Sequence, residues 1–585
     1  MIPLLVALAC ASDSAPQLSY TLTVPTDRSA YLVELHITNP PNPSRLVIPA
    51  WAPGAYQLMN SGTNIGDFEA VTRAADRLPV HQDSPNSWVI DTQGTQLLTV
   101  RYTAGLRDSV AWRRPNNRWF LRATSGMVDG PRTFMYLDGF KQLPATLAFQ
   151  VPPGWRIATG LTPTTRDSIT FTAPNYDVLI DSPMLLGEFL SYAFRAAGTP
   201  HRAVVDLGGA RAAAPAAFVN MLRRISTTAL LIFGGAPYRD YTYIFVGGRG
   251  GGLEHLNSTT IGVTTETLAR NPRGAQTVSA HEFFHAWNVK RIRPIELGPF
   301  NYEREVRTVN LWWSEGVTDY YADLILARAG LNTPADFARR LARSMENFQN
   351  DAARMVISPE RSSWTTWDSP AVNQGAYISY YLQGELLGFL LDLAIRDSTD
   401  NTRSLDDVMR FLMQHYSGDH GFTRDQLVEA VRNATGCDFA EFWRLYVSGT
   451  YDIPWNNYLK AAGWRLVLTK TPAVDARIGS IPPAVQGGRW RAVAPLGAAW
   501  LAGLRTGDEL VRINRRDIID GTDVTAAVRS IKPGTTVMVE VMRNSQPVTI
   551  RFRANTYERE RAALRDLPLQ TTKMRRIRAG LTGTP

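Results

Sequence analysis

Two histidines lie four residues apart in the run His281-Glu282-Phe283-Phe284-His285, and a glutamate directly follows the first. Residues i and i+4 of a helix share one face, so both imidazoles can reach one metal ion. Glu282 then lies at the rim of the site, where it can take a proton from a water molecule at the metal. The chain has only 8 histidines, so a chance H-E-x-x-H is rare. The spacing predicts a site for one Zn²⁺, with two structural histidines on a half-buried helix as the alternative.

A catalytic zinc needs a third protein ligand and a position left for water. Glu303 and Glu305 lie 18 and 20 residues past His285, and Glu315 lies 30 residues past it. The first two belong to the charged stretch NYEREVR, which is typical of a solvated loop. Glu315 belongs to NLWWSEGVTDYY, which is aromatic and compatible with a helix. Because a metal-binding carboxylate belongs on a rigid, packed element, we predict Glu315 as the third ligand.

Three separated motifs carry a resemblance to one family. They are HEFFHAWNVKRIRP followed by LWWSEGVTDYY, then GGGLEHLNST around Glu254, and SYYLQG at residues 379–384. Together they resemble the glycyl aminopeptidase family of gluzincin zinc metallopeptidases. The resemblance implies a thermolysin-like catalytic domain with two His and one Glu on zinc, and a preference for small N-terminal residues such as Gly or Ala. Thermolysin-like enzymes usually place the Glu at a shorter spacing, so Glu305 stays the alternative to Glu315.

Glu254 is the candidate substrate-binding residue. In related aminopeptidases the matching segment is a strand along the substrate cleft, and its Glu binds the free α-amino group. The preceding glycines, Gly252 among them, let a backbone approach closely. A buried carboxylate is costly unless it meets a cation, and a terminal ammonium could be that cation. The alternative is an ordinary loop Glu paired with Arg249.

The motif SYYLQG resembles the start of a family helix, Y-x-x-G, in which a Tyr hydroxyl stabilises the tetrahedral intermediate. The matching residue is Tyr381, which the resemblance makes a catalytic candidate beside Glu282. Tyr377 and Tyr380 are close enough to compete for this role. Asp319, four residues after Glu315, is either a partner that orients a metal-binding His or a surface charge.

At 585 residues the chain is long enough for several domains, each with its own core. We predict a multidomain fold: an N-terminal all-β domain, a thermolysin-like α+β catalytic domain that is mostly helical after the zinc motif, and a C-terminal PDZ-like β-rich domain. The predicted boundaries are a leader at 1–16, the β-domain at 17–200, the zinc peptidase domain at 201–455, the PDZ-like domain at 463–555 and a basic tail at 556–585. Within them we expect helices over 214–231, 377–395 and 427–446, a strand over 241–246 and a long loop over 350–374.

Two further segments resemble parts of known domains. The run Trp51-Ala52-Pro53-Gly54-Ala55-Tyr56 resembles the family's W-x-P-G-x-Y turn, which we expect to shape one side of the cleft. Residues 499–514, AWLAGLRTGDELVRIN, look like the core of a PDZ domain. PDZ domains commonly bind extended peptides by strand addition. The loop at 477–481 departs from the usual carboxylate-binding pattern, so peptide binding by this domain stays open.

The net charge of +9 comes from 62 basic and 53 acidic residues, without a nucleic-acid-binding motif. We therefore expect no nucleic acid among the partners. The family resemblance implies peptide substrates, and the PDZ-like segment implies a peptide or protein ligand for that domain. The basic run at 573–578 is expected to solvate a chain end or touch an anionic surface. Two other functions remain open: a thermolysin-like endopeptidase and a non-catalytic PDZ adaptor.

The chain begins with a short apolar segment that ends in small residues, which is typical of a secretory or lipoprotein leader. We expect an exported protein, either periplasmic or an outer-envelope lipoprotein anchored through Cys10, and otherwise secreted. If the leader is removed, Cys437 is the remaining cysteine and no disulfide within the chain can form. We expect no transmembrane span, because no other apolar run is long enough.

Overall fold

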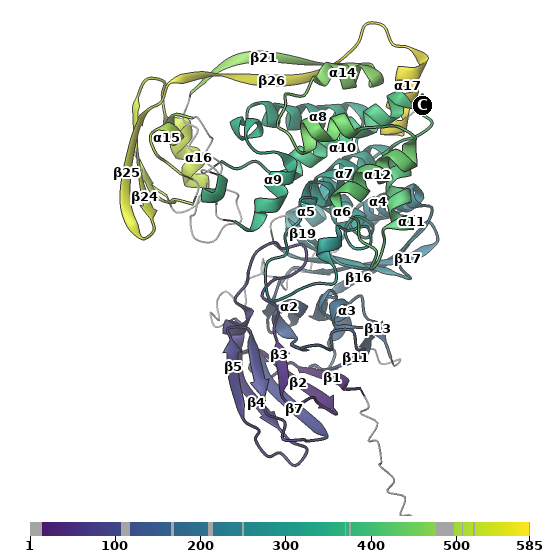
Figure 1. Ribbon diagram of the computed structural model, residues 1–585, viewed down its shortest axis with the longest axis vertical. Coiled ribbons are helices and arrows are strands. Elements are labelled where there is room, and N and C mark those ends of the chain that lie inside the picture. Colours follow the sequence, from purple (N-terminus) through teal and green to yellow (C-terminus); the bar gives the residue numbers. More distant parts are fainter. Residues whose placement is uncertain are drawn as a thin grey trace, which may run out of the picture. The chain divides into compact units, whose positions relative to one another are not determined.

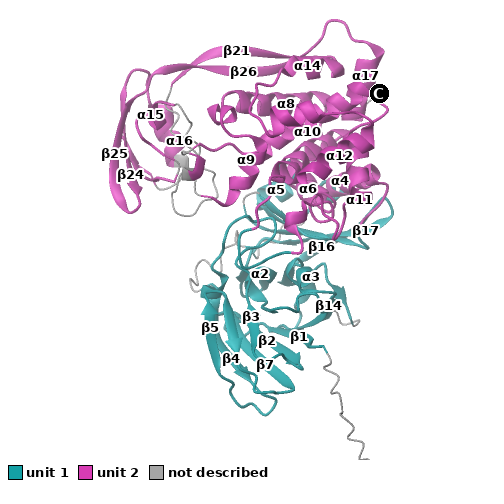
Figure 2. Cartoon of the chain, viewed as in Figure 1, with its two compact units in different colours: residues 1–220, 238–275, 300–305 teal, residues 221–237, 276–299, 306–585 magenta. Residues whose placement is uncertain are grey.

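The computed structural model describes residues 15–106, 118–164, 169–208, 214–248, 251–368, 370–373, 376–474, 497–505, 507–518 and 521–583 (Figure 1). Cys10 with most of the expected leader, Arg249, and the loop at 477–481 lie outside these residues. The chain forms two compact units (Figure 2). Unit 1 comprises residues 1–220, 238–275 and 300–305, and unit 2 comprises residues 221–237, 276–299 and 306–585.

Unit 1 is built from β-sheets, as predicted for the N-terminal part of the chain. Alternating apolar residues produce the strands: in QLSYTLT, the side chains of Leu18, Tyr20 and Leu22 are buried and those between them are not. The seven-stranded sheet has the order β13 (Thr162–Pro163), β14 (Thr170–Ala173), β11 (Ala145–Gln150), β1 (Gln17–Thr23), β2 (Tyr31–Thr38), β7 (Leu97–Ala104), β4 (Ile65–Val71). Its buried face packs into one continuous apolar core.

Three smaller sheets complete unit 1. Two have four strands each: β10 (Tyr136–Leu137), β3 (Ser44–Val47), β6 (Ser87–Ile90), β5 (Val80–Ser84); and β12 (Arg156–Ala158), β15 (Met184–Gly187), β9 (Ser125–Val128), β8 (Phe120–Leu121). The third has the order β16 (Leu190–Ala196), β17 (Thr199–Asp206), β18 (Tyr241–Gly247), β20 (Ser258–Val263), β19 (Gly252–Glu254). Short helices α2 (Gly130–Thr133), α3 (Tyr176–Ile180) and α5 (Thr265–Ala269) connect them. Strand β18 confirms the strand expected at 241–246, and its seven residues are all buried.

Helix α4 (Ala216–Phe233) confirms the helix expected at 214–231. Among the described residues it is the one helix whose length and composition would allow it to cross a membrane, and 44% of it is buried. This is weak evidence for a span, because core helices of globular domains pass the same test. Phe218 of α4 lies edge-on to Phe245 of β18, with ring centroids 4.9 Å apart, as in a helix that covers a sheet.

Unit 2 is mostly helical, as predicted for the region after the zinc motif. The helices are α6 (Gln276–Phe284), the π-helix η4 (Trp312–Val317), α7 (Thr318–Arg328), α8 (Pro334–Gln349), α9 (Pro359–Trp364), α10 (Tyr380–Ser398), α11 (Leu405–His415), α12 (Arg424–Thr435), α13 (Ala440–Phe442), a second π-helix η8 (Trp443–Val447) and α14 (Trp455–Leu459).

Three expectations for unit 2 need correction. The stretch 350–374 is not one long loop, since it holds η5 (Ala352–Met355), α9, η6 (Thr365–Trp367) and η7 (Pro370–Asn373). Helix α10 starts at Tyr380, not at 377, because the Ser379 side chain caps it by accepting the N–H of Tyr381. The helix expected at 427–446 is interrupted after Thr435, where Gly436 takes a left-handed φ of 73°.

The PDZ region has a core of its own. Strands β23 (Arg516–Asp517), β22 (Glu509–Ile513), β24 (Thr536–Arg543) and β25 (Gln546–Arg553) form one sheet, and α15 (Ala498–Leu501) and α16 (Gly521–Ser530) accompany it. Buried aliphatic residues of these strands and helices form a separate apolar cluster. The chain enters and leaves through a long antiparallel pair, β21 (Trp464–Val474) and β26 (Thr556–Asp566).

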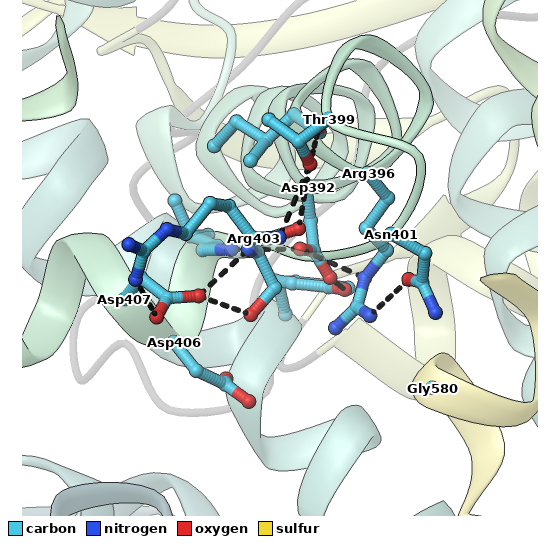
Figure 3. A network of polar contacts seen from close by, with 12 residues as sticks. Asp392, Arg396, Thr399, Asn401, Arg403, Asp406, Asp407 and Gly580 are labelled. Carbon is cyan, nitrogen blue, oxygen red and sulfur yellow. Dashed lines mark hydrogen bonds and ion pairs between the residues drawn. The ribbon is translucent and has the colours of Figure 1, made fainter. Parts of the chain in front are cut away.

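The C-terminal segment differs from the solvated tail expected from its charge. It continues from β26 into helix α17 (Thr572–Thr582), which buries Ile577 and Leu581 completely. The Arg328 guanidinium of α7 donates to the Gly580 carbonyl at 2.9 Å. Figure 3 shows the polar network beside this contact, in which Asp392 accepts from the Arg396 guanidinium of the next helical turn at 3.1 Å. The basic side chains are thus part of a packed helix that docks on α7 of unit 2.

Candidate metal centre and active site

Helix α6 positions the two histidines through its aromatic neighbours. His285 lies one residue past the last residue of the helix, but its N–H still donates to the His281 carbonyl at 3.3 Å. The i, i+4 geometry therefore holds across the helix end. Phe284 stacks on Tyr321 of α7, with ring centroids 4.2 Å apart, and Trp287 stacks on Phe233 at 4.7 Å. These contacts pack the end of α6 and the turn after it against α7 and α4, and so hold the segment that carries both histidines.

Glu315 lies in the π-helix η4, directly before α7. Single π-helical turns are rare and occur often at functional sites. A close contact with α10 accompanies this one: a Cβ on Gly384 would lie 2.0 Å from the Trp312 carbonyl oxygen, and a Cβ on Gly316 would lie 2.4 Å from the Gly384 Cα. The glycine of the Y-x-x-G motif therefore lets the start of α10 pack against the segment that carries Glu315.

The predicted ligand atoms converge. His285 Nε2 lies 3.0 Å from His281 Nε2, and Glu315 Oε2 lies 3.4 Å from the first histidine's Nε2 and 3.3 Å from the second's. Ligands about 2.1 Å from a tetrahedral zinc lie about 3.4 Å from one another, so the three residues fit such an ion. All three side chains are nearly or fully buried. Neither Glu303 nor Glu305 belongs to the metal-compatible clusters of the described residues, and Glu303 instead pairs with Arg45 at 2.6 Å.

The outer nitrogens of both imidazoles face acceptors. His281 Nδ1 lies 2.8 Å from Asp319 Oδ1, and His285 Nδ1 lies 2.6 Å from the Asn288 carbonyl oxygen. An oxygen acceptor at Nδ1 requires the proton there, which leaves the Nε2 lone pair for a metal. Two such lone pairs and a carboxylate oxygen directed at one point repel one another unless a cation lies between them. The donor set therefore fits a metal ion.

Oppositely charged neighbours shift the pKa values of Glu315 and His281 in opposite directions. Burial opposes a charged Glu315, but His285 and His281 hold its pKa below the ordinary value. Burial likewise opposes a charged His281, yet Asp319 and Glu315 raise its pKa well above the ordinary value. A buried group that keeps its charge against desolvation does so because its neighbours supply the opposite sign.

Glu282 and the tyrosines lie around the cluster. Glu282 is 6% exposed and follows His281 on α6. The Tyr381 ring lies nearly parallel to the His281 ring, with centroids 6.1 Å apart. Tyr380 is buried against Tyr381, and its pKa is raised by burial and by Glu315. Tyr377 is 43% exposed. Both Tyr380 and Tyr381 thus belong to the surroundings of the histidine–glutamate cluster.

Glu254 belongs to unit 1, where it ends strand β19. Gly252 begins that strand and pairs with Ile261 of β20, and Glu254 pairs with Thr259. Glu254 is 4% exposed, and within the described part of the chain its Oε1 atom has no hydrogen-bond partner. An unpaired buried carboxylate oxygen is costly, so this oxygen calls for a cation that the described residues do not supply.

Sequence reasoning missed one residue of the site. Asn288 holds His285 through its carbonyl, and its side-chain amide donates to the Trp313 carbonyl at 2.9 Å and to the Thr318 hydroxyl at 3.0 Å. It therefore ties the histidine segment to the segment that carries Glu315. Its place three residues after the second histidine was visible in HEFFHAWN, but nothing in the pattern indicated a partner 25 residues away.

Comparisons with known proteins match three parts of the chain. The Peptidase M61 N-terminal domain matches residues 19–188, M61 glycyl aminopeptidase matches residues 275–387, and a PDZ domain matches residues 484–553. The chain thus matches the models of both M61 domains and of a PDZ domain. The second match includes H-E-x-x-H, Glu315 and Tyr381, so unit 2 contains a metallopeptidase domain with a metal-compatible His–His–Glu cluster. PDZ domains commonly bind peptides.

One solved structure agrees with the fold over nearly the whole chain. The aminopeptidase N family protein from Idiomarina loihiensis is 25% identical, with a TM-score of 0.80, over 97% of this chain and 100% of that chain. An M1 zinc metallopeptidase from Deinococcus radiodurans is 17% identical with a TM-score of 0.47, over 75% of this chain and 94% of that one. Yeast LTA4 hydrolase in complex with bestatin is 13% identical with a TM-score of 0.49, over 77% of this chain and 70% of that one. No curated protein matches the sequence significantly.

Proposed function

We propose that this protein is a zinc-dependent aminopeptidase that removes N-terminal residues, small ones such as Gly and Ala preferred, from peptides. The metallopeptidase part rests on the convergence of His281, His285 and Glu315 in a domain that matches M61 glycyl aminopeptidase. The choice of an aminopeptidase over an endopeptidase rests on one observation: the buried Glu254 carboxylate, whose Oε1 lacks a partner among the described residues. The α-ammonium of a free N-terminus has the charge and the donors that such an oxygen needs.

The roles of the other residues follow from their chemistry. One Zn²⁺ held by the three ligands would polarise the scissile carbonyl and lower the pKa of a water molecule. Glu282, next to His281 and nearly buried, accepts the proton of the attacking water and passes it to the leaving amine. Tyr381 donates its hydroxyl hydrogen to the oxyanion of the tetrahedral intermediate. Tyr380 is the alternative donor.

Other residues orient the metal ligands and bind the substrate before the peptide bond is cleaved. Asp319 and Asn288 keep both histidines in one tautomer, which leaves each Nε2 free to bind metal. Glu254 accepts the substrate's α-ammonium, so a peptide with a blocked N-terminus loses this charge-assisted contact. The burial of Glu254 strengthens the contact because little water competes for the carboxylate.

The test compares Gly- and Ala-peptides with free and N-acetylated N-termini, with the enzyme as purified, after chelation and after addition of zinc. We expect cleavage of the free peptides, loss on chelation and recovery with zinc. Equal cleavage of acetylated and free peptides would support a thermolysin-like endopeptidase, and no cleavage of either by the zinc-loaded protein would support the non-catalytic PDZ adaptor. Cleavage that survives verified removal of metal would overturn the metallopeptidase mechanism.

We also propose that the protein is exported, on the basis of the leader-like residues 1–16. Fractionation of cells that express the full chain tests this. The expected result is protein in the envelope or the medium, and replacement of Cys10 by Ser separates a lipid-anchored form from a released one.

A further inference from the structure

The turn at residues 51–56 lies directly against the Glu254 carboxylate. Gly54 of this turn has a φ of +86°. A Cβ placed on it would lie 2.5 Å and 2.8 Å from the two carboxylate oxygens of Glu254, and 2.8 Å from the Leu253 Cδ1. These distances are far below ordinary van der Waals contact. The Glu254 carboxylate therefore packs against the Gly54 Cα, in the space that a side chain at this position would occupy.

The backbone at Gly54 cannot shift easily, because hydrogen bonds hold the turn in place. Trp51 is fully buried, and its indole N–H donates to the Asn301 carbonyl at 2.7 Å. The Ala50 N–H donates to the Tyr302 carbonyl at 2.8 Å. Within the turn, the Ala55 N–H donates to the Ala52 carbonyl at 3.0 Å. The turn is thus fixed by hydrogen bonds to a segment more than two hundred residues away in the sequence.

The backbone of Glu254 is also fixed. Its strand β19 pairs with β20, and the next residue, His255, donates its N–H to the Ser258 carbonyl at 3.0 Å. The Leu256 N–H donates to Asp181 Oδ2 at 2.7 Å. With both backbones held, a Cβ at residue 54 can be accommodated only by rotation of the Glu254 and Leu253 side chains, and the two closest contacts are with the Glu254 carboxylate.

We propose that Gly54 is a positioning residue for recognition of the substrate's N-terminus: the missing side chain at 54 sets where the Glu254 carboxylate lies. The proposal rests on the proposed role of Glu254 and extends it to the N-terminal M61 domain. A methyl group at 54 pushes the carboxylate away and moves the anion that receives the α-ammonium. Selectivity for a free N-terminus therefore depends on a residue outside the motifs that supply the metal ligands and the base.

The test is Gly54→Ala with Gly154→Ala as the matched control. Gly154 has nearly the same φ, +83°, but a Cβ there would meet nothing within 4 Å. Both variants place an alanine at a positive φ, which is unfavourable for a residue with a Cβ, and only Gly54→Ala adds a contact with Glu254. We expect Gly54→Ala to lower kcat/KM on free-amine peptides by about ten- to a hundred-fold, the cost of a displacement of roughly 1 Å. Zinc content and the rate on N-acetylated peptides should match those of the control.

A double variant identifies Glu254 as the intermediary. In the Glu254→Ala background, Gly54→Ala should cause no further loss of kcat/KM, and its effect on Tm should be smaller than in the parent because the two closest contacts are gone. The comparison of Tm values works even if Gly54→Ala folds poorly, since the double variant relieves the clash. Equal losses in both backgrounds, or a Gly54→Ala enzyme no worse than the control, would overturn the proposal for Gly54 while leaving Glu254 in its role. If Glu254→Ala itself leaves the preference for free N-termini unchanged, both proposals are wrong.

Discussion

The histidine–glutamate cluster in unit 2 and Glu254 in unit 1 both contain buried ionisable side chains, but these have different sets of partners. In the cluster, three ligand atoms lie 3.0–3.4 Å apart, and each imidazole has a second partner on its outer nitrogen. At Glu254, a carboxylate oxygen is equally buried but has no partner in the described part of the chain. Both regions are incomplete without a cation, and they differ in how firmly the surrounding groups are held.

Under the proposed function, this difference would separate a resident cation from one that arrives with each substrate. A metal site gains affinity when every ligand is oriented beforehand by outer contacts, and Asp319 and Asn288 provide that. A site for a substrate group must release its ligand after every turnover, so one carboxylate held by packing against Gly54 is sufficient. The predictions below test this distinction, from the largest expected effect to the smallest.

Loss of a metal ligand should have the largest effect. Glu315→Gln removes a charged ligand from a buried site, so we expect most of the zinc to be lost and activity to fall below detection. Metal analysis of the purified variant measures this directly. Glu305→Gln is the control and should keep both zinc and activity; zinc loss in that variant instead would mean that the third ligand was chosen wrongly.

Glu282→Gln should abolish turnover without removing the metal. Gln has the size of Glu but cannot accept a proton, and loss of a general base costs about 10²- to 10⁴-fold in kcat. Zinc content should equal that of the parent, which separates this residue from the three ligands. Comparable loss of zinc and activity would assign Glu282 to the metal site and not to proton transfer.

Tyr381→Phe removes one hydroxyl from the surroundings of His281. Loss of one oxyanion donor costs about 10²- to 10³-fold in kcat, and KM should change little because the contact forms in the transition state. Tyr380→Phe is the matched control on the neighbouring residue and should cost less. The reverse order would make Tyr380 the oxyanion donor.

Glu254→Ala should act on the substrate and leave the metal in place. A charge-assisted contact contributes roughly 1.5–3 kcal/mol, so kcat/KM on free-amine peptides should fall about ten- to a hundred-fold. The preference for free over N-acetylated peptides should shrink by the same factor, with zinc unchanged. If acetylated and free peptides are both cleaved as by the parent, Glu254 has no part in recognition and the endopeptidase is favoured.

The smallest effect concerns an acid beside Asp319. Glu385 accepts the Ser344 hydroxyl at 2.9 Å, and burial together with Asp319 and Asp323 raises its pKa to about 8. Between the ordinary value of 4.5 and about 8 the folded protein then holds a proton that the unfolded chain has lost, so this group lowers stability as pH rises through that window. Glu385→Gln lacks the titration. The difference in Tm between the variant and the parent should therefore shift in favour of the variant as the pH rises from 5 to 8. A difference that stays constant with pH would contradict the assignment.

The sequence by itself determined the features that depend on local spacing. The i, i+4 histidines at the end of α6, the helix-compatible stretch around Glu315 and the three-part fold were readable from periodicity and motif. Their roles in catalysis stay predictions. These features follow from residues within about one or two helical turns of each other, and neighbours at that distance constrain one another whatever the rest of the chain does.

Only the tertiary structure decided how distant segments meet. It placed Asn288 between the histidines and the Glu315 segment, and it made the Gly384 backbone touch Trp312 across 72 residues. It also turned the expected basic tail into a helix docked on Arg328, and it set Gly54 against Glu254 across 200 residues. Packing of this kind depends on which surfaces exclude water together, and no pattern along a single segment carries that information.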